Sequence, residues 1–401
     1  MSSRSFLVVG GGAVGLASAY RILQRFPGST LTLLEKEDGV GRHQTGNNSG
    51  VMHCGLAYRP GTAKARLAVR GIRQLTEFCI EKQIRHDVCG KLVVANREDQ
   101  IPRLHDLCER GTANGLHGLR MLTPAEMKEI EPHSGGVAGL HVPEEGITDY
   151  PAVCETLARE IESLGGRVVC GAKVSALKER GGEWVAETPK GEFAGGILVT
   201  CAGLQADRVA RLAGEAPESR IVPFRGDYYQ LKPGREHLVR HLIYPVADPS
   251  FPFLGVHFTR MIAGGIEAGP NAVLALKREG YTRTSFDAAD AYDALTFPGL
   301  WRFIGRHFKM CLGELERSFS KELFCRSLQN LVPEVQPEDL VEAGAGVRAQ
   351  AMHPAGRLVE DFDIICRAAA VHVLNAPSPA ATACLAIGEE VAARAAQAGG
   401  E

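Results

Sequence analysis

Residues 5–35 read SFLVVGGGAVGLASAYRILQRFPGSTLTLLE and decide the fold. Ser5–Val9 is a short apolar run typical of a buried strand, and a helical pattern follows the glycines as far as Arg25. A Pro-Gly pair then ends the helix, and Thr30–Leu34 is predicted to be a second strand. The stretch therefore predicts one βαβ unit with a glycine-rich turn at the start of its helix.

The spacing Gly10-x-Gly12-x-x-Gly15 in this context indicates dinucleotide binding. The first glycine makes a tight turn, the second admits a pyrophosphate, and the third lets helix and strand pack closely. Glu35 lies twenty residues beyond Gly15, at the end of the second predicted strand, where a carboxylate binds ribose hydroxyls. Its negative charge also argues against a 2′-phosphate on that ribose.

The segment after Glu35 favours FAD over NAD. A plain NAD domain would continue into another helix and strand, whereas residues 41–50 form a polar, glycine-bearing run without helical periodicity. Such a loop suits a flat ring system that needs many backbone and amide hydrogen bonds. We therefore expect FAD, and because no Cys or His linkage motif is visible, we expect it to be bound non-covalently.

Composition excludes several classes of function. The 401 residues have a formal net charge of −2, so no basic excess exists for nucleic acid. Eleven scattered cysteines, without a C-x-x-C pair, indicate reduced thiols in a cytoplasmic protein, and we expect no metal site. The longest uncharged run, between Arg367 and Glu389, is interrupted by prolines and polar residues, so membrane contact is expected to be at most peripheral, on the inner face of the cell membrane.

Eight further motifs lie along the chain: HQTGNNSGVMH (43–53), KARL (64–67), CGKL (89–92), RIVPFRGDY (220–228), FPFLGVHF (251–258), GPNA (269–272), GVRAQA (346–351) and NAPSPAAT (375–382). Together they resemble the L-2-hydroxyglutarate dehydrogenase/oxidase family, a branch of the D-amino-acid-oxidase-like flavoproteins. The resemblance runs from about residue 5 to about residue 395. It departs from the family pattern at Arg260, at Ala263 and in residues 300–319.

The resemblance implies an α/β fold with two domains. A Rossmann-like FAD-binding domain, a parallel sheet with helices, would combine residues 1–85, 145–215 and 335–401. An inserted α+β substrate-binding domain with a mixed, largely antiparallel sheet would consist of residues 86–144 and 216–334. Pro377–Thr382 would open the last helix, whose N-terminus in this superfamily stabilises the reduced flavin.

The predicted cofactor site draws on six parts of the chain: the glycine turn, the end of the second strand, the polar loop, Val174, the pair 202–203, and the segment 375–382. Its residues are Gly10, Gly12, Ala13, Val14, Gly15, Glu35, Lys36, Arg42, His43, Thr45, Asn47, Asn48, Ser49, Gly50, Val51, Val174, Ala202, Gly203, Asn375, Ser378, Pro379, Ala380, Ala381 and Thr382.

The implied reaction is oxidation of an α-hydroxy acid, with a base that takes the hydroxyl proton. Histidine titrates near neutrality, so His53 and His257 are the leading candidates for the base, and water or His372 is the other route. The implied substrate is a small dicarboxylate, which arginine binds through its planar fork. By the resemblance, Arg348 matches the arginine that binds the α-carboxylate in related oxidases. Arg225 is a second candidate, for flavin or the distal carboxylate, and Tyr228 a hydrogen-bond donor.

Three functions remain open at this point. The first is oxidation of an L-2-hydroxy acid, best L-2-hydroxyglutarate to 2-oxoglutarate. The second is an amino-acid or amine oxidase of the glycine- or sarcosine-oxidase type, and the third is a flavin-binding protein without turnover. Fold does not decide among them. The electron acceptor also stays open between oxygen, a membrane quinone and a carrier protein.

Overall fold

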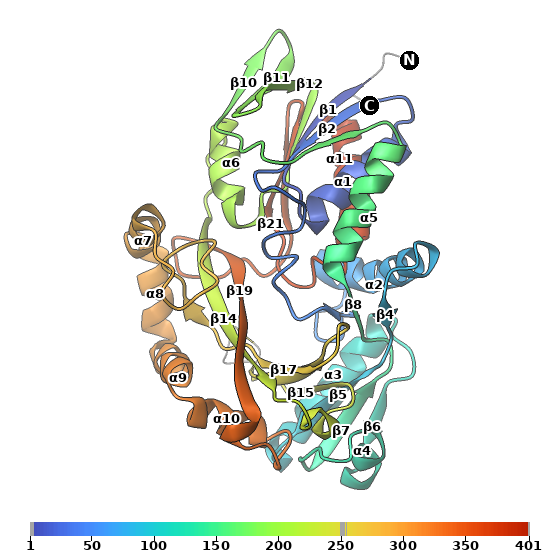
Figure 1. Cartoon of the computed structure of the whole chain (residues 1–401), viewed down its shortest axis with the longest axis vertical. Helices are drawn as coiled ribbons and strands as arrows, with labels where there is room; N and C mark the ends of the chain where they lie inside the picture. Colours follow the sequence, from blue (N-terminus) through green and yellow to red (C-terminus); the bar gives the residue numbers. More distant parts are fainter. Residues whose placement is uncertain (1–3, 249–252, 254, 400–401) are drawn as a thin grey trace.

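The computed structural model describes residues 4–248, 253 and 255–399, which form two main sheets with helices around them (Figure 1). One sheet lies at the end of the molecule that carries both termini, and the second lies toward the opposite end. Phe251, Pro252 and Leu254 of the FPFLGVHF motif lie outside the described residues. Within them, no helix is both long enough and apolar enough to cross a membrane.

The first sheet has six strands in the order β20-β21-β13-β1-β2-β9, and the edge strand β20 runs antiparallel to β21. The pairings among the other five are parallel. β1 lies inside this sheet and is buried from Phe6 onward, as parallel strands covered on both faces require. The predicted βαβ unit is confirmed. The strands are β1 (Ser5–Val9), β2 (Thr30–Leu34), β9 (Arg167–Val169), β13 (Ile197–Thr200), β20 (Asp363–Arg367) and β21 (Ala370–Asn375).

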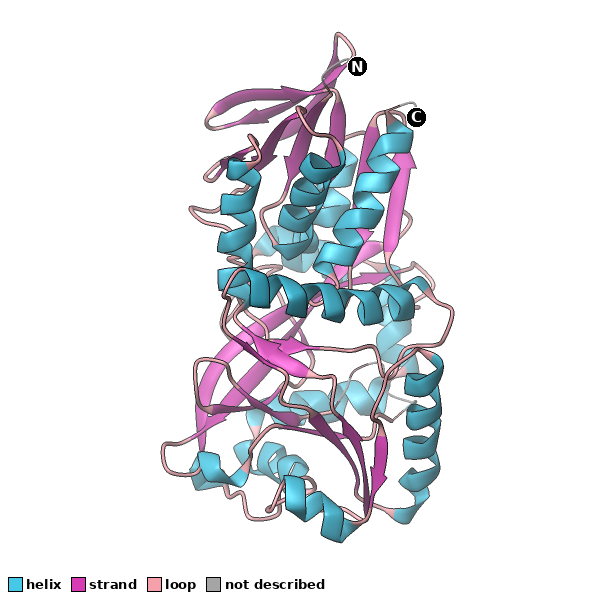
Figure 2. Cartoon of the chain, turned by 90° about the vertical axis from the view of Figure 1, so that its right-hand side faces the viewer, coloured by secondary structure: helices cyan, strands magenta, loops and turns pink. Residues whose placement is uncertain are grey.

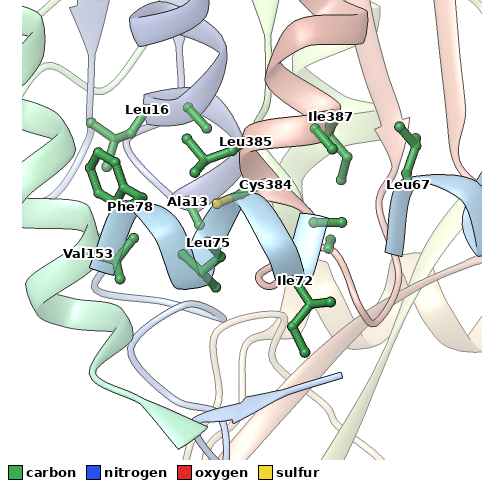
Figure 3. Close-up of a cluster of buried hydrophobic side chains, with 14 of the residues drawn as sticks. Ala13, Leu16, Leu67, Ile72, Leu75, Phe78, Val153, Cys384, Leu385 and Ile387 are labelled. Carbon is green, nitrogen blue, oxygen red and sulfur yellow. The ribbon is translucent and has the colours of Figure 1, made fainter. Parts of the chain in front are cut away.

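Four helices share one hydrophobic cluster with this sheet, and a row of helices beside it is visible in Figure 2. Leu16, Phe78, Val153 and Leu385, one from each helix, gather in Figure 3. The backbones of two of the helices approach closely at Gly388, where an added Cβ would lie 2.6 Å from the Ala17 carbonyl oxygen. The four are α1 (Ala13–Arg25), α2 (Ala63–Glu81), α5 (Tyr150–Ser163) and α11 (Cys384–Ala398).

A small antiparallel sheet and a helix pack on the first sheet through a separate cluster that includes Leu7, Trp184 and Val209. These elements are β10 (Ala176–Arg180), β11 (Glu183–Thr188), β12 (Gly191–Gly195) and α6 (Ala206–Leu212). A second small sheet, in the order β3-β8-β4, consists of β3 (Val51–Met52), β4 (His86–Asp87) and β8 (Gly146–Thr148).

The second main sheet is mixed and largely antiparallel, with the order β18-β14-β17-β16-β15-β5-β7-β6 and β19 paired to β14. β15 and β5 are the parallel pair. β19 pairs with β14 from Leu340 to Met352. We therefore propose that these residues belong to the substrate-binding domain, although the resemblance implies that 335–401 belong to the FAD-binding domain. The strands are β5 (Lys91–Ala95), β6 (Arg120–Leu122), β7 (Ala138–Val142), β14 (Arg220–Leu231), β15 (Leu242–Pro245), β16 (His257–Arg260), β17 (Ile266–Gly269), β18 (Val273–Leu274) and β19 (Leu340–Met352).

Helices surround the second sheet, and four of them, α7 to α10, follow one another between Ala288 and Gln329. The helices are α3 (Ile101–Ala113), α4 (Pro124–Ile130), α7 (Ala288–Leu295), α8 (Pro298–Arg306), α9 (Phe308–Phe319) and α10 (Lys321–Gln329), with short 3-10 turns η1 (Glu98–Gln100), η2 (Gly203–Gln205), η3 (Glu236–Leu238) and η4 (Pro337–Asp339). One expected boundary is wrong: Thr382 does not open the last helix, because residues 378–383 form turns before α11 begins at Cys384.

Candidate active site

A cavity of about 1340 Å³ is lined by residues of both main sheets. Its walls are the glycine turn before α1, the polar loop of residues 41–51, parts of β14 and β19, and the segment 375–382. Small-molecule sites usually occupy about 300–1,000 Å³. This cavity therefore has room for a large cofactor together with a small substrate.

At two glycines of the turn, Gly10 and Gly15, another part of the backbone lies too close for a side chain, whereas Gly12 has more space around it. Gly10 has a φ of +114°, and an added Cβ would lie 2.3 Å from the Cys201 carbonyl oxygen. At Gly15 an added Cβ would lie 1.9 Å from the Gly10 carbonyl oxygen, so α1 packs tightly on the turn. Gly12 is the N-cap of α1 and has no side-chain cap, and an added Cβ there would meet Thr45 Oγ1 at 3.4 Å. The Ala13 N–H donates to Thr45 Oγ1 at 3.2 Å, and the rest of this helix N-terminus, which Gly12 caps without a side chain, fits a pyrophosphate.

The Glu35 carboxylate is held by the backbone at the end of β2. Its Oε2 accepts a hydrogen bond from the Gly11 N–H at 2.6 Å, and its Oε1 accepts one from the Glu37 N–H at 2.9 Å. The residue is buried and lines the cavity. Each carboxylate oxygen can accept more than one hydrogen bond, so both remain able to accept ribose hydroxyls.

The amides of the polar loop brace the loop itself. Asn47 Nδ2 donates to the carbonyl oxygens of Arg42 and His43, and Asn48 Nδ2 donates to that of Thr45 at 2.7 Å. The sequence predicts that amides of this loop hydrogen-bond a flavin, and in the structure these side-chain donors bind the loop's own carbonyl oxygens. The loop forms part of the cavity wall, because its residues from Gly41 to Val51, apart from Gly46 and Gly50, line the cavity.

Lys36 forms the centre of a polar cluster at the nucleotide end of the cavity. Its Nζ lies 2.5 Å from Glu37 Oε1, 2.7 Å from His43 Nε2 and 2.9 Å from Glu279 Oε2. Hydrogen bonds from Lys36 and His43 lower the pKa of Glu37 to about 2. Among the described residues, Glu37, His43 and Glu279 are the group with metal-ligand spacing, and the ammonium occupies the place of a cation.

The segment before α11 closes the cavity from another side. Asn375 Nδ2 donates to the carbonyl oxygens of Val359 and Asp361, so this predicted ligand also braces the backbone. Thr382 Oγ1 accepts from the His53 N–H at 3.1 Å and lies 2.8 Å from the Tyr150 hydroxyl. The segment thus joins the last helix to His53, the residue that follows β3.

His53 contacts a buried carboxylate. Its Nδ1 lies 3.1 Å from Glu145 Oε2, and Lys91 Nζ lies 2.8 Å from Glu145 Oε1. Glu145 is 1% exposed, and all three residues line the cavity. Burial alone would raise the pKa of Glu145, but Lys91 and His53 outweigh burial and hold the pKa below its ordinary value. The carboxylate is therefore ionised at neutral pH.

His257 is in a different environment. Its Nδ1 lies 2.9 Å from the Gly255 carbonyl oxygen, which can only accept, so this nitrogen carries the proton and Nε2 is bare. The ring of Tyr244 stacks on it with centroids 3.9 Å apart. Burial, together with the charges of His53 and Arg348, lowers the pKa of His257 to about 3. His257 is therefore neutral at physiological pH.

Arg348 of β19 lies at the cavity wall without an acidic partner. Its hydrogen bond to the Asn271 carbonyl oxygen is long, at 3.5 Å, and its guanidinium lies over the Phe253 ring. None of the ion pairs formed by the described residues includes Arg348. Burial lowers its pKa from the ordinary arginine value, but arginine still stays charged. A guanidinium placed in this way fits a carboxylate ligand.

Arg225 lies outside the cavity lining, which does not support its predicted contact with flavin or substrate. Its Nε donates to Asp227 Oδ1 at 2.7 Å, and its Nη1 donates to the Thr282 carbonyl oxygen. Tyr228 does line the cavity. Burial and the charge of Glu267 raise the pKa of Tyr228, so its hydroxyl stays protonated and can donate.

The cavity gathers most of the predicted site residues. Those outside its lining are Arg225, Gly15, Gly50 and His372, and His372 is fully buried against Thr200. The lining includes His53, His257, Arg348, Tyr228, Gly10, Gly12, Ala13, Val14, Glu35, Lys36, Arg42, His43, Thr45, Asn47, Asn48, Ser49, Val51, Val174, Ala202, Gly203, Asn375, Ser378, Pro379, Ala380, Ala381 and Thr382.

Lys91, Glu145 and Tyr244 are among the lining residues to which the sequence assigns no role. Lys91 belongs to the CGKL motif, which supports the family resemblance but does not by itself indicate a role for Lys91 in the site. Glu145 and Tyr244 stand in segments with no motif at all. Their contact with the two histidines arises from the fold alone.

An open glycine turn, a buried carboxylate after the second strand and a cavity containing His and Arg define a nucleotide-dependent oxidoreductase. The sequence profile of the DAO family, described as FAD dependent oxidoreductase, matches residues 5–394. The chain belongs to this family, within the group whose curated members carry the name L-2-hydroxyglutarate dehydrogenase. FAD is its cofactor.

Three relatives with that name span bacteria and animals. The protein from Indibacter alkaliphilus is 50% identical over 96% of this chain and 97% of its own length. The Escherichia coli K12 protein is 41% identical over 97% of this chain and 92% of its own length. The human mitochondrial protein is 41% identical over 98% of this chain and 88% of its own length.

Solved structures share the fold at lower identity. L-alpha-glycerophosphate oxidase from Mycoplasma pneumoniae, determined with FAD bound, superposes with a TM-score of 0.80 at 22% identity, over 99% of this chain and 95% of that one. Glycine oxidase from Geobacillus kaustophilus gives 0.73 at 16% identity, over 99% and 95%. These similarities support the architecture.

We predict that Gly12→Val lowers the FAD content of the purified protein severely while the chain still folds. Thr45 Oγ1, at 3.4 Å, is the one described atom within 4 Å of an added Cβ at Gly12, so the fold tolerates a side chain there, whereas the close approach of a pyrophosphate does not. Flavin absorbance per chain measures the FAD content, and circular dichroism shows whether the variant folds. A variant with a full flavin complement would show that the pyrophosphate binds elsewhere.

Proposed function

We propose that this protein oxidises L-2-hydroxyglutarate to 2-oxoglutarate. FAD supplies the hydride acceptor for such a reaction when it is bound. The relatives support the substrate, since proteins named for it match almost the whole chain. The observation that carries the proposal is Arg348, a guanidinium that forms no ion pair with any acidic residue in the described part of the chain and shares a cavity with His53.

In this proposal Arg348 binds the α-carboxylate of the substrate and Tyr228 donates a hydrogen bond nearby. A bidentate Arg–carboxylate pair fixes both the position and the orientation of the α-carbon. The Phe253 ring beneath the guanidinium keeps its plane in place. The substrate is thereby held with its hydroxyl toward the histidines.

We assign the base to His53. Its Nδ1 is engaged by Glu145, which leaves Nε2 to accept the hydroxyl proton. His257 is a poor proton acceptor because its pKa is lowered to about 3, far below the neutral range in which a general base is effective. In our proposal its bare Nε2 accepts a hydrogen bond and helps to orient the substrate.

The competing functions are separated by anaerobic mixing of the purified yellow protein with candidate substrates. We expect L-2-hydroxyglutarate to bleach the flavin absorbance, and glycine and sarcosine to leave it unchanged. Bleaching by glycine or sarcosine instead would favour an amine oxidase. Bleaching by none of the three would favour a flavin protein without turnover on these compounds.

We predict that Arg348→Lys weakens substrate binding and leaves FAD content unchanged. Lysine keeps the charge but loses the planar fork. The loss of a charge-assisted pair is about 1.5–3 kcal/mol, equivalent to a roughly tenfold to hundredfold fall in kcat/KM. Steady-state kinetics and flavin absorbance measure both effects. Unchanged kinetics would remove Arg348 from the substrate site.

We also propose that the exposed face of α9 binds an anionic membrane surface peripherally. Phe308, Leu312, Leu315 and Phe319 recur at helical spacing and are exposed. Trp301 of α8 is exposed next to them in the chain, and the exposed basic residues nearby are Arg302, Arg306, Lys309 and Arg326. Apolar residues beside basic ones are typical of helices that lie in a membrane interface.

We predict that the holoenzyme co-sediments with vesicles that contain phosphatidylserine and far less with neutral phosphatidylcholine vesicles. The double variant Phe308→Ser/Phe319→Ser should remain in the supernatant. Ile80→Ser is a matched control, because Ile80 is exposed on α2, away from this face. Equal sedimentation of the wild type and the double variant would contradict the assignment.

A further inference from the structure

We propose that Glu145 is the positioning residue of the reaction: it holds His53 in the tautomer whose bare Nε2 faces the substrate, and it stabilises the imidazolium that forms. This inference rests on the proposed function, in which His53 takes the hydroxyl proton. Glu145 itself acts through His53 and does not need to touch the substrate.

The two carboxylate oxygens of Glu145 have different hydrogen-bond donors. Oε1 accepts from Lys91 Nζ at 2.8 Å, from the Cys54 N–H at 3.2 Å and from the Cys54 thiol at 3.3 Å. Oε2 is left for His53 Nδ1, at 3.1 Å. An ionised carboxylate only accepts hydrogen bonds. His53 Nδ1 must therefore carry a proton, and in the neutral ring Nε2 is bare.

The surroundings hold the His53 ring in this orientation. The backbone N–H of His53 donates to Thr382 Oγ1, and the Tyr244 ring meets the imidazole edge to face at 6.2 Å between centroids. Tyr244 also lies 5.0 Å from Lys91 Nζ and stacks on His257. The carboxylate, the lysine and both histidines are thus packed around one aromatic ring.

The charges around His53 show why Glu145 favours a positive charge on the ring. Around His53, Tyr244 of β15 meets the ring edge to face, Lys91 of β5 binds the other oxygen of Glu145, and His257 of β16 stacks on Tyr244. Lys91 is cationic and opposes an imidazolium, whereas Glu145 is the anion bonded to the ring. Its negative charge is therefore what favours proton transfer to His53.

The test is Glu145→Gln, which keeps the size of the side chain. Lys91 and the Cys54 N–H can only donate, so they retain the amide oxygen and turn the NH₂ group toward His53 Nδ1. The ring proton then moves to Nε2, where it blocks the base. We expect anaerobic flavin reduction to slow by about 10²–10⁴ and to lose its dependence on pH near neutrality. Glu145→Asp should restore part of the pH dependence.

A readout without substrate separates this inference from the proposed function. Nitrogen NMR of protein labelled at histidine, with His53 assigned through His53→Gln, reports which ring nitrogen carries the proton. We expect Nδ1 in the wild type and Nε2 in Glu145→Gln. The same tautomer in both would overturn the inference, even if L-2-hydroxyglutarate proves to be the substrate. Failure of L-2-hydroxyglutarate to reduce the flavin would overturn the proposed function alone.

Glu131→Gln is the matched control. Glu131 is fully buried, its Oε1 lies 3.1 Å from His241 Nδ1, and it also accepts from backbone N–H groups, but it lies outside the cavity lining. It should leave the rate and pH profile of flavin reduction unchanged. If Glu145→Gln lowered only substrate affinity or FAD content and kept the wild-type pH profile, Glu145 would be structural and the inference wrong.

Discussion

The rest of the site depends on the contact of two backbones at Gly10. An added Cβ at this residue would lie 2.3 Å from the carbonyl oxygen of Cys201, which follows β13, and one at Gly15 would press on Gly10 itself. Only without these side chains can α1 start directly above the sheet, with its N-terminus open at Gly12. Glu35 then reaches the Gly11 N–H from the neighbouring strand. The nucleotide end of the cavity is therefore a consequence of packing in the sheet.

Pairing of β14 with β19 sets the other end of the cavity. Side chains alternate between the two faces of a strand, so Arg225 and Asp227 share one face of β14 and Tyr228 lies on the other. The first two form an ion pair away from the cavity, whereas Tyr228 lines it. The partner strand contributes Arg348. One antiparallel pair therefore supplies both a structural arginine and a candidate substrate arginine.

The parts that the sequence predicts well are those in which local pattern and structure coincide. The βαβ unit and its glycines follow from spacing within thirty residues, and the motifs around His53 and Arg348 carry the family resemblance. The long pairing of β19 with β14 joins segments more than a hundred residues apart, so no local pattern reveals it. For the same reason Glu145, which stands ninety-two residues from His53 in the chain, gave no sequence signal. Arg225 lies outside the cavity lining because it shares a face of β14 with Asp227 and not with Tyr228.

The two histidines show why residue type alone does not assign a base. Both line one cavity and both contact Tyr244, so sequence and proximity treat them alike. Their Nδ1 partners differ: a neutral carbonyl oxygen for His257 and a carboxylate for His53. A carbonyl oxygen fixes the tautomer but offers little to an imidazolium against burial and nearby cations, whereas a carboxylate both fixes the tautomer and stabilises the charge. The different roles of the two histidines therefore follow from the atom that is hydrogen-bonded to each Nδ1, and the fold alone determines which atom that is.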